Sequence, residues 1–170
     1  ADLLAANLVD RVFSDPGNYS GVEVIAGVFA YTAQIYYDFS AYSDIAIGSA
    51  ALLGFSIPLN FDAPYRAADL RDFWRRWHIS LSTWIWDYLF NPLTSFFLRR
   101  VARLELPEVK QEMRLAYPAA AMSTMLLCGL WHGAGWTYVV WGGLHGLFLS
   151  VERLVVFRGR SSARRRPIKD

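Results

Sequence analysis

Apolar positions in this chain run in long uncharged stretches, not in the alternating pattern of a half-exposed strand. The longest stretch extends from Leu115 to Val151 and contains no Asp, Glu, Lys or Arg. Residues 45–61 and 24–37 form two shorter uncharged stretches. A membrane span needs about 20 predominantly apolar residues, so the longest stretch could cross a bilayer nearly twice. The pattern therefore predicts transmembrane helices.

The predicted fold class is all-α, a polytopic transmembrane helical bundle. Small residues let helix backbones approach closely in a membrane, and the second predicted helix is rich in Ala, Gly and Ser. Pro58 is expected to end that helix. The predicted helices cover residues 21–38, 41–57, 115–133 and 134–157, and a basic tail follows at 158–170.

The segment between these helices, residues 68–100, is predicted to be a broken or re-entrant helix. It begins in "ADLRDFWRRWH", which carries too many charges to span, and Asp69 and Asp72 suit a first helical turn. The sequence then becomes apolar and is interrupted at Pro92. Broken backbone at membrane depth is tolerated where it is buried in protein or lines a wet cavity. We expect a loop and a short helix to follow at residues 101–114.

The composition favours a membrane protein over a soluble domain. The chain is 54% hydrophobic and 16% aromatic, and its mean hydropathy is positive, at +0.21. It begins at Ala1, without an initiator methionine and without a signal peptide. We therefore expect residues 1–170 to form a single partial domain of a longer membrane protein, with further spans upstream.

The net charge of +2 is less informative than where the charges lie. The basic tail of residues 158–170 follows a predicted span, and the positive-inside rule places such a flank in the cytoplasm. Because a membrane flank explains these arginines, no nucleic-acid partner is predicted. The single cysteine, Cys128, excludes an internal disulfide and a cysteine-based metal cluster, and we expect it to be a packed core residue.

The segment "GLWHGAGWTYVVWGGLHG" carries two of the three histidines in otherwise apolar sequence. An ionisable residue such as His132 is costly there unless it has a partner or water, so it is a functional candidate. The neighbouring glycines would let another helix, a substrate or a cofactor come close. A neutral imidazole is a suitable general base near neutral pH. The alternative is a histidine that hydrogen-bonds two helices together.

For each of the other two histidines, the sequence supports a structural role about as well as a functional one. His145 follows His132 by thirteen residues, which is not a metal-ligand spacing on one helix, so it could pack helices or line a pocket. His78 lies where a basic segment becomes apolar, which suits a residue facing a cavity or an interfacial residue. The sequence contains no nucleophile elbow, phosphate loop or zinc-site spacing, and no metal site is predicted.

The sequence leaves the roles of two arginines and two aspartates undecided. Arg75 and Arg76 lie beside tryptophans and could hold a phosphate or carboxylate, or could anchor the chain at lipid headgroups. Asp38 and Asp44 lie between the first two predicted helices and could be loop charges or could line a polar pocket.

Two stretches together resemble one family. "QIYYDFSAYSDIAIGSAALLGFSIPLNFDAPYRAADLRDFWRRWHISLSTWIWDYLFNPL" and "GLWHGAGWTYVVWGGLHG" closely resemble membrane-bound O-acyltransferases, within the bacterial branch that O-acylates polysaccharides such as alginate. The resemblance covers roughly residues 30–152. It implies a multi-span protein with a central tunnel, in the bacterial inner membrane, that moves an acyl group onto a hydroxyl.

The resemblance also implies roles for single residues. His132 matches the family's catalytic histidine in "WHG", and His78 matches a second essential histidine of the bacterial branch. The implied donor is acetyl-coenzyme A or an acyl carrier protein, with no bound cofactor, and the implied partners are a polysaccharide and periplasmic or membrane proteins of an acetylation complex. Residues assigned to substrate or donor binding are Arg75, Arg76, Trp131, Asp87 and His145.

The chain departs from the family pattern at one informative position. Trp86 stands where arginine is common before "DYL", and Thr94-Ser95 follow "PL" in place of glycines, so substrate preference is expected to differ. The acceptor stays open among alginate, cellulose, peptidoglycan and teichoic acid. Two rivals to an enzyme are a membrane transporter and a non-catalytic scaffold of a polysaccharide modification complex. The chain by itself is expected to be inactive.

Overall fold

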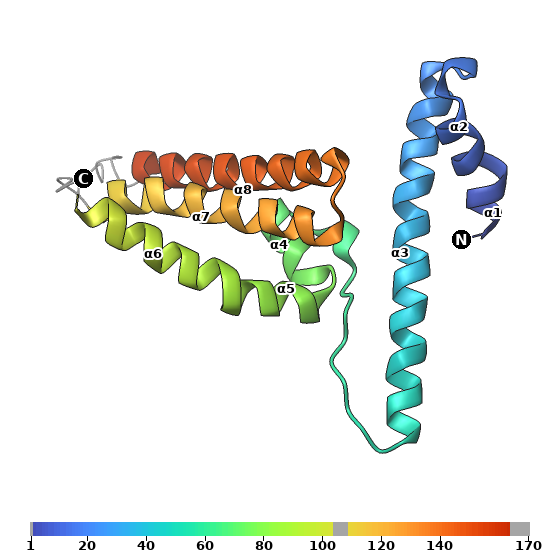
Figure 1. Ribbon diagram of the computed structural model, residues 1–170, viewed down its shortest axis with the longest axis horizontal. Coiled ribbons are helices and arrows are strands. Elements are labelled where there is room, and N and C mark those ends of the chain that lie inside the picture. The colour runs from blue at the N-terminus through green and yellow to red at the C-terminus, as the bar shows by residue number, and fades with distance from the viewer. Residues whose placement is uncertain (1, 104–108, 164–170) are drawn as a thin grey trace, which may run out of the picture. The chain divides into compact units, whose positions relative to one another are not determined.

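The computed structural model describes residues 2–103 and 109–163, with side chains described for 2–103 and 114–155 (Figure 1). These residues form helices and no strand, which confirms the predicted all-α class. The chain divides into two compact units, Ala1–Phe61 and Asp62–Asp170, and the single partial domain expected from the sequence stays a prediction. Of the basic tail expected at 158–170, residues 158–163 are instead helical, and of the loop and short helix expected at 101–114, residues 109–114 are helical; residues 104–108 and 164–170 lie outside the described residues.

The first unit consists of short helical segments packed on one long helix. Val12 is almost fully buried, and a Cβ added at Gly27 would lie 3.0 Å from its Cγ1 atom. Glycine at position 27 therefore lets the short segments approach the long helix. The elements are α1 (Asp2–Leu4), η1 (Ala5–Val9), α2 (Asp10–Ser14), η2 (Pro16–Asn18) and α3 (Gly21–Leu52).

Helix α3 replaces the two helices predicted at 21–38 and 41–57. The capping box of Ser20 and Glu23 starts the helix, with the Ser20 N–H donating to Glu23 Oε2 at 2.8 Å. No proline or glycine interrupts the backbone between Gly27 and Gly48, so the polar residues around position 40 stay helical. The helix ends at Leu52, ahead of Gly54 at φ 82°, so the expected stop at Pro58 was wrong.

The second unit is built around the antiparallel pair α7 and α8, with α6 packed along α7 (Figure 1). Its core contains Phe90, Tyr117, Ala120, Ala121, Met125 and Leu149. The N–H of Leu70 donates to Glu152 Oε2 at 3.0 Å, which fixes the start of α4 on α8. The elements are η3 (Pro64–Arg66), α4 (Leu70–Arg76), α5 (Ile79–Ile85), η4 (Trp86–Phe90), α6 (Asn91–Ala102), α7 (Val109–His132) and α8 (Trp136–Ala163).

Glycines determine how closely α7 and α8 pack. A Cβ at Gly129 would lie 2.3 Å from the Tyr138 carbonyl oxygen, and a Cβ at Gly142 would lie 2.3 Å from the Met125 carbonyl oxygen. At Gly146, the added atom would lie 2.9 Å from the Met122 Cα. The glycines therefore accommodate a neighbouring helix, the first of the three options that the sequence left open.

The segment predicted as a broken helix is broken, but at a different place. The backbone stays helical through Asn91-Pro92, because the π-helical η4 leads directly into α6, whose second residue is Pro92. The break lies instead between α4 and α5, where His78 adopts a left-handed conformation at φ 43° and ψ 57°. The predicted helix start near Asp69 and Asp72 is confirmed, but Asp69 lies just ahead of α4 and caps it by accepting from the Asp72 N–H at 2.7 Å.

Among the described residues, no helix combines the length and the hydropathy that a bilayer crossing requires. Gly, Ser, Tyr and Trp are interspersed among the aliphatic residues of α3, α7 and α8 and lower the mean hydropathy of each helix.

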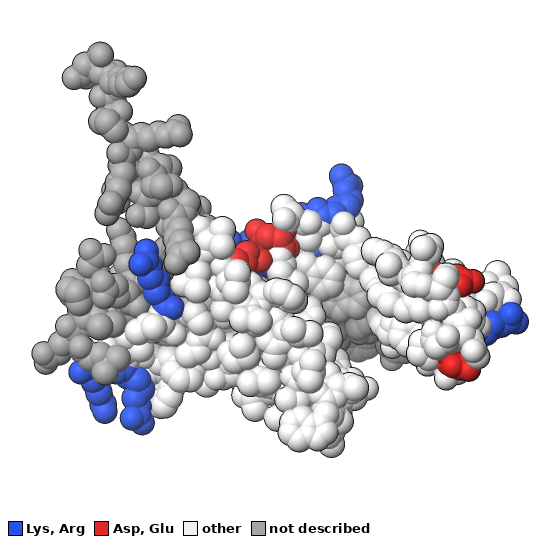
Figure 2. All heavy atoms as spheres, turned by 90° about the horizontal axis from the view of Figure 1, so that it is seen from above, with Lys and Arg blue, Asp and Glu red and all other residues white. Residues whose placement is uncertain are grey.

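One face of α8 carries an exposed apolar stripe. Its members are 47–56% exposed and recur at helical spacing along the side not covered by α7: Leu144, Leu147, Phe148 and Val151. Figure 2 shows a face of the molecule on which uncharged side chains predominate and charged ones form small separate groups. Exposed apolar surface of this kind is typical of an interaction site.

Candidate functional site

His132 is the last residue of α7 and is exposed at the turn into α8. Its imidazole contacts three aromatic rings: Trp131 at 4.9 Å, Tyr138 at 6.2 Å and nearly parallel, and Trp141 at 5.3 Å edge-on. A Cβ at Gly133 would lie 2.5 Å from Tyr138 Cε2, so glycine there lets the Tyr138 ring lie beside the histidine. The C-terminal end of a helix favours positive charge, which suits an imidazole that accepts a proton.

His78 occupies the break between α4 and α5. Its carbonyl oxygen accepts from the Ser82 N–H at 2.9 Å and so begins α5, while the Ser82 hydroxyl donates to the Trp77 carbonyl oxygen at 2.9 Å. The side chain is half-buried. Burial lowers the pKa of His78 below its usual value, and electrostatic repulsion from His132 lowers it further. Two histidines separated by 54 positions in the sequence therefore interact electrostatically in the fold.

Trp141 connects two of the histidines. Its ring lies 5.3 Å from His132 and 4.6 Å from His145, and Trp74 of α4 lies 5.3 Å from His145. Helices α4, α7 and α8 thus contribute to one group of aromatic and imidazole rings. His145 is half-buried within it, and its Nδ1 atom has no hydrogen-bond partner among the described residues. These contacts support the interpretation of His145 as a residue that packs helices.

The two predicted arginines lie in different environments. Arg76 pairs with Asp72 at 3.1 Å and with Asp62 at 3.4 Å, and its carbonyl oxygen accepts from the Asp62 N–H at 3.0 Å. These bonds fix the segment ahead of α4 and engage the Arg76 guanidinium, which argues against a substrate-binding role. Arg75 forms no such pair within the described residues and lines a pocket.

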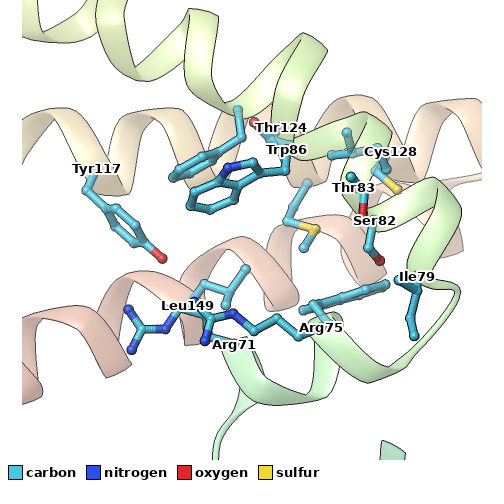
Figure 3. Close-up of a pocket in the computed structure, with 14 residues that line it drawn as sticks. Arg71, Arg75, Ile79, Ser82, Thr83, Trp86, Tyr117, Thr124, Cys128 and Leu149 are labelled. Atoms are coloured by element: carbon cyan, nitrogen blue, oxygen red, sulfur yellow. The ribbon is translucent and has the colours of Figure 1, made fainter. Parts of the chain in front are cut away.

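This pocket, of about 380 Å³, lies within the second unit (Figure 3). Arg71 and Arg75 of α4 both line it, together with aromatic and aliphatic side chains from α5, η4, α7 and α8. Sequence reasoning missed Arg71, although its spacing of four from Arg75 places both on one helix face. Neither His78 nor His132 lines the pocket, although Ile79 does.

The remaining predicted residues lie apart from this pocket. Trp131 is 66% exposed and contacts the His132 ring, whereas Asp87 is exposed on η4. Asp38 and Asp44 are exposed on α3, within the first unit. Cys128 is buried, as predicted, and lines the pocket.

The lowered pKa of His78 predicts how stability depends on pH. A histidine with a folded-state pKa below its unfolded value of about 6.5 binds a proton more readily when the protein unfolds, so stability falls as pH decreases through that value. We expect the thermal unfolding midpoint to fall between pH 7.5 and pH 5.5 by more in the wild type than in His78→Asn. Asparagine tolerates the left-handed backbone and does not titrate there. Equal decreases in both proteins would contradict the prediction.

Residues 13–104 match the model of MBOAT, the membrane-bound O-acyltransferase family. The chain is 44% identical over 153 residues to the probable alginate O-acetylase AlgI of Pseudomonas aeruginosa, covering 90% of this chain and 26% of the relative.

Two further relatives extend the comparison. The probable alginate O-acetylase AlgI of Azotobacter vinelandii is 46% identical over 158 residues, covering 90% of this chain and 28% of the relative. A peptidoglycan O-acetyltransferase of Helicobacter pylori is 39% identical over 148 residues, covering 87% of this chain and 25% of the relative. The chain thus spans about a quarter of the length of the curated relatives that it matches.

Proposed function

The chain belongs to the membrane-bound O-acyltransferase family, and on this basis we propose that the protein transfers an acyl group, acetyl in the first instance, to hydroxyls of an exported polysaccharide. The observation that carries the proposal is the electrostatic interaction of His132 with His78 in a chain of this family, since two interacting histidines can handle a proton and a developing charge. The histidines come from separate elements, the end of α7 and the break before α5.

His132 is the proposed general base. It takes the proton from an acceptor hydroxyl, and the hydroxyl oxygen attacks the carbonyl carbon of an acyl thioester. The new C–O bond forms as the C–S bond breaks, and the departing thiolate receives the proton back from the imidazolium. The ring of Trp141 lies edge-on to the imidazole of His132 at 5.3 Å, and the ring of Tyr138 lies nearly parallel to it at 6.2 Å.

His78 is the proposed partner of this base. Burial and the charge of a protonated His132 both lower the pKa of His78, which favours the neutral form of its imidazole. A neutral imidazole can donate one hydrogen bond and accept another. His78 can therefore orient the acceptor hydroxyl or stabilise the negative charge that develops on the acyl oxygen.

The proposed acceptor, membrane location and donor follow from the family and from relatives of similar sequence. Relatives named for alginate and peptidoglycan acetylation support an exported glycan as acceptor, and the family name supports a bilayer environment. The exposed apolar stripe of α8 is compatible with that environment. We propose the bacterial inner membrane as the location, with a cytoplasmic C-terminus. Acetyl-coenzyme A or an acyl carrier protein is the proposed donor, and further membrane or periplasmic proteins complete the transfer.

A direct assay separates this function from a transporter or scaffold. The full-length protein, purified in an uncharged detergent, is incubated with an acetyl thioester and an alginate oligosaccharide, with a peptidoglycan fragment as a second acceptor. We expect release of free thiol that depends on acceptor and a matching mass increase of the glycan. Thiol release without acetylated glycan would indicate hydrolysis. If neither product forms with either acceptor or with a native membrane extract, the transporter and scaffold interpretations gain support.

A further inference from the structure

The pocket of the second unit is a site that the proposed acyl transfer does not use. It lies among α4, α5, η4, α7 and α8, and neither His132 nor His78 lines it. Figure 3 shows Tyr117 at one end and Ser82, Thr83 and Cys128 at the other. Its apolar lining residues are Trp74, Ile79, Ile85, Trp86, Phe90, Met125, Cys128 and Leu149.

The Tyr117 region of the pocket is electropositive. Tyr117 interacts electrostatically with Arg71, Arg75, Arg153 and Glu152. The carboxylate of Glu152 accepts the Leu70 N–H at 3.0 Å, and the Arg153 guanidinium lies 5.3 Å from the centre of the Tyr117 ring. Within the described part of the chain, neither Arg71 nor Arg75 forms an ion pair with an acidic side chain. Asp72 also interacts electrostatically with Arg75, so three arginines and two carboxylates leave a small excess of positive charge there.

A pocket that combines arginines with an apolar lining favours a ligand that has an anionic group and a hydrocarbon chain. Two guanidinium groups on one helix face can both donate to a phosphate, and a half-buried cation such as Arg71 is stabilised by an anion. The rest of the pocket offers mostly carbon, which disfavours a glycan and favours a hydrocarbon chain. A volume of about 380 Å³ lies within the range of small-molecule sites.

We propose that this pocket binds a phosphate-headed amphiphile. The phosphate lies between Arg71 and Arg75 near the Tyr117 hydroxyl, and the hydrocarbon chain lies along Trp74, Phe90, Met125 and Leu149. Trp86 forms part of the wall, with its ring stacked on Phe90 at 4.6 Å. The source is either a membrane phospholipid or a soluble alkyl phosphate, since both present the same chemistry.

The first experiment measures binding of octyl phosphate to the purified full-length protein. Titration calorimetry is carried out in an uncharged detergent, below the critical micelle concentration of the probe. We expect saturable binding that weakens at least about tenfold in Arg75→Gln and further in Arg71→Gln/Arg75→Gln, because each removes charge-assisted hydrogen bonds to phosphate. Arg75 is exposed, so its replacement should not affect folding. Arg100→Gln is the matched control, because Arg100 lies on α6 over Phe96, outside the pocket.

A second set of probes separates the contribution of the phosphate group to binding from that of the hydrocarbon chain. Inorganic phosphate should bind at least about a hundredfold more weakly than octyl phosphate, since each buried methylene contributes about fourfold. Trp86→Ala should weaken octyl phosphate about fivefold or more and leave inorganic phosphate unchanged, because it removes apolar wall only. Octyl glucoside, which has the chain without the charge, should not compete with octyl phosphate.

The source is identified by native mass spectrometry of protein taken from nanodiscs that contain phosphatidylglycerol. Retention of this lipid by the wild type and its loss in the double variant would identify a membrane phospholipid. Absence of lipid in both, with octyl phosphate binding intact, would identify a soluble alkyl phosphate. Equal octyl phosphate binding by wild type and double variant would overturn the proposal, as would equal affinity for octyl phosphate and inorganic phosphate. These readouts do not depend on acyl transfer, so the proposed enzyme activity and this site can fail separately.

Discussion

Acyl transfer by the full-length protein is expected to fall by about 10² to 10⁴-fold when His132 is replaced with alanine, which is the usual contribution of a general base. The structural reason is that His132 is placed at the exposed end of α7, with aromatic rings against its imidazole and the negative helix terminus beneath it. Alanine removes the proton acceptor and leaves these surroundings in place. The measurement is O-acetyl content of the exported polysaccharide in the native host, with protein levels in the membrane determined by blotting.

Two controls make the result specific. Because His132 is exposed, His132→Ala should change the thermal unfolding midpoint little. Thr137→Ala alters another exposed residue, at the start of α8 and outside the ring contacts of His132, and should keep full activity. Wild-type O-acetyl content in a well-expressed His132→Ala strain would remove this residue from the proposed mechanism.

The second large effect concerns the contact between α7 and α8. Replacing Gly142 with alanine adds a Cβ that would lie 2.3 Å from the Met125 carbonyl oxygen, a distance that real Cβ atoms essentially never show. The two backbones must separate, and overpacking of this kind costs about 1–3 kcal/mol or more. Separation also moves Trp141 and His145, which flank Gly142 in α8. We therefore expect a lowered unfolding midpoint in detergent together with reduced acyl transfer.

The neighbouring residue is a matched control for this substitution. A Cβ at Gly143 would lie 3.8 Å from Leu126 Cδ2, an ordinary contact distance. Gly143→Ala also replaces glycine by a better helix former, which favours the helix by about 0.5–1 kcal/mol. Gly143→Ala should therefore leave stability unchanged or slightly raised. If the two alanine variants unfold alike, close packing at Gly142 is not what holds α7 against α8.

Features that depend on local sequence were predicted most accurately. The predicted helices at 115–133 and 134–157 correspond to α7 and α8, because long apolar segments separated by glycines define both. The start of α4 near Asp69 and Asp72 also followed from sequence. The prediction of two helices in place of the continuous α3 was wrong. Polar residues such as Asp38 were interpreted as a loop, although these residues do not prevent helix formation.

Features that depend on packing could not be predicted. Pro92 was expected to interrupt the helix, but a proline in a first turn is compatible with helix, and the actual break falls at His78, which carries no glycine or proline to mark it. Arg75 and Arg76 are adjacent in sequence, and only Arg76 meets Asp62, which lies fourteen positions earlier in the chain. Arg71 drew no attention because its significance depends on Tyr117.

The sequence did identify the histidines, and the fold adds how they are related. His132 and His78 were singled out separately, and their electrostatic interaction requires α7 to approach the junction of α4 and α5. Trp141, which contacts both His132 and His145, was not among the predicted site residues. Its position nine residues after His132, across a turn, gives no periodic signal from which that contact could have been inferred.

The short link between α7 and α8 has a consequence for how the protein folds. Only Gly133–Gly135 separate the two helices, and their mutual contacts join residues close in sequence. Contacts between neighbouring segments close small loops and form early, whereas distant contacts form late. The hairpin that carries His132, Trp141 and His145 can therefore assemble as an early kinetic unit. The approach of His78, whose contacts span a much longer stretch of chain, would then be a later step that completes the histidine pair.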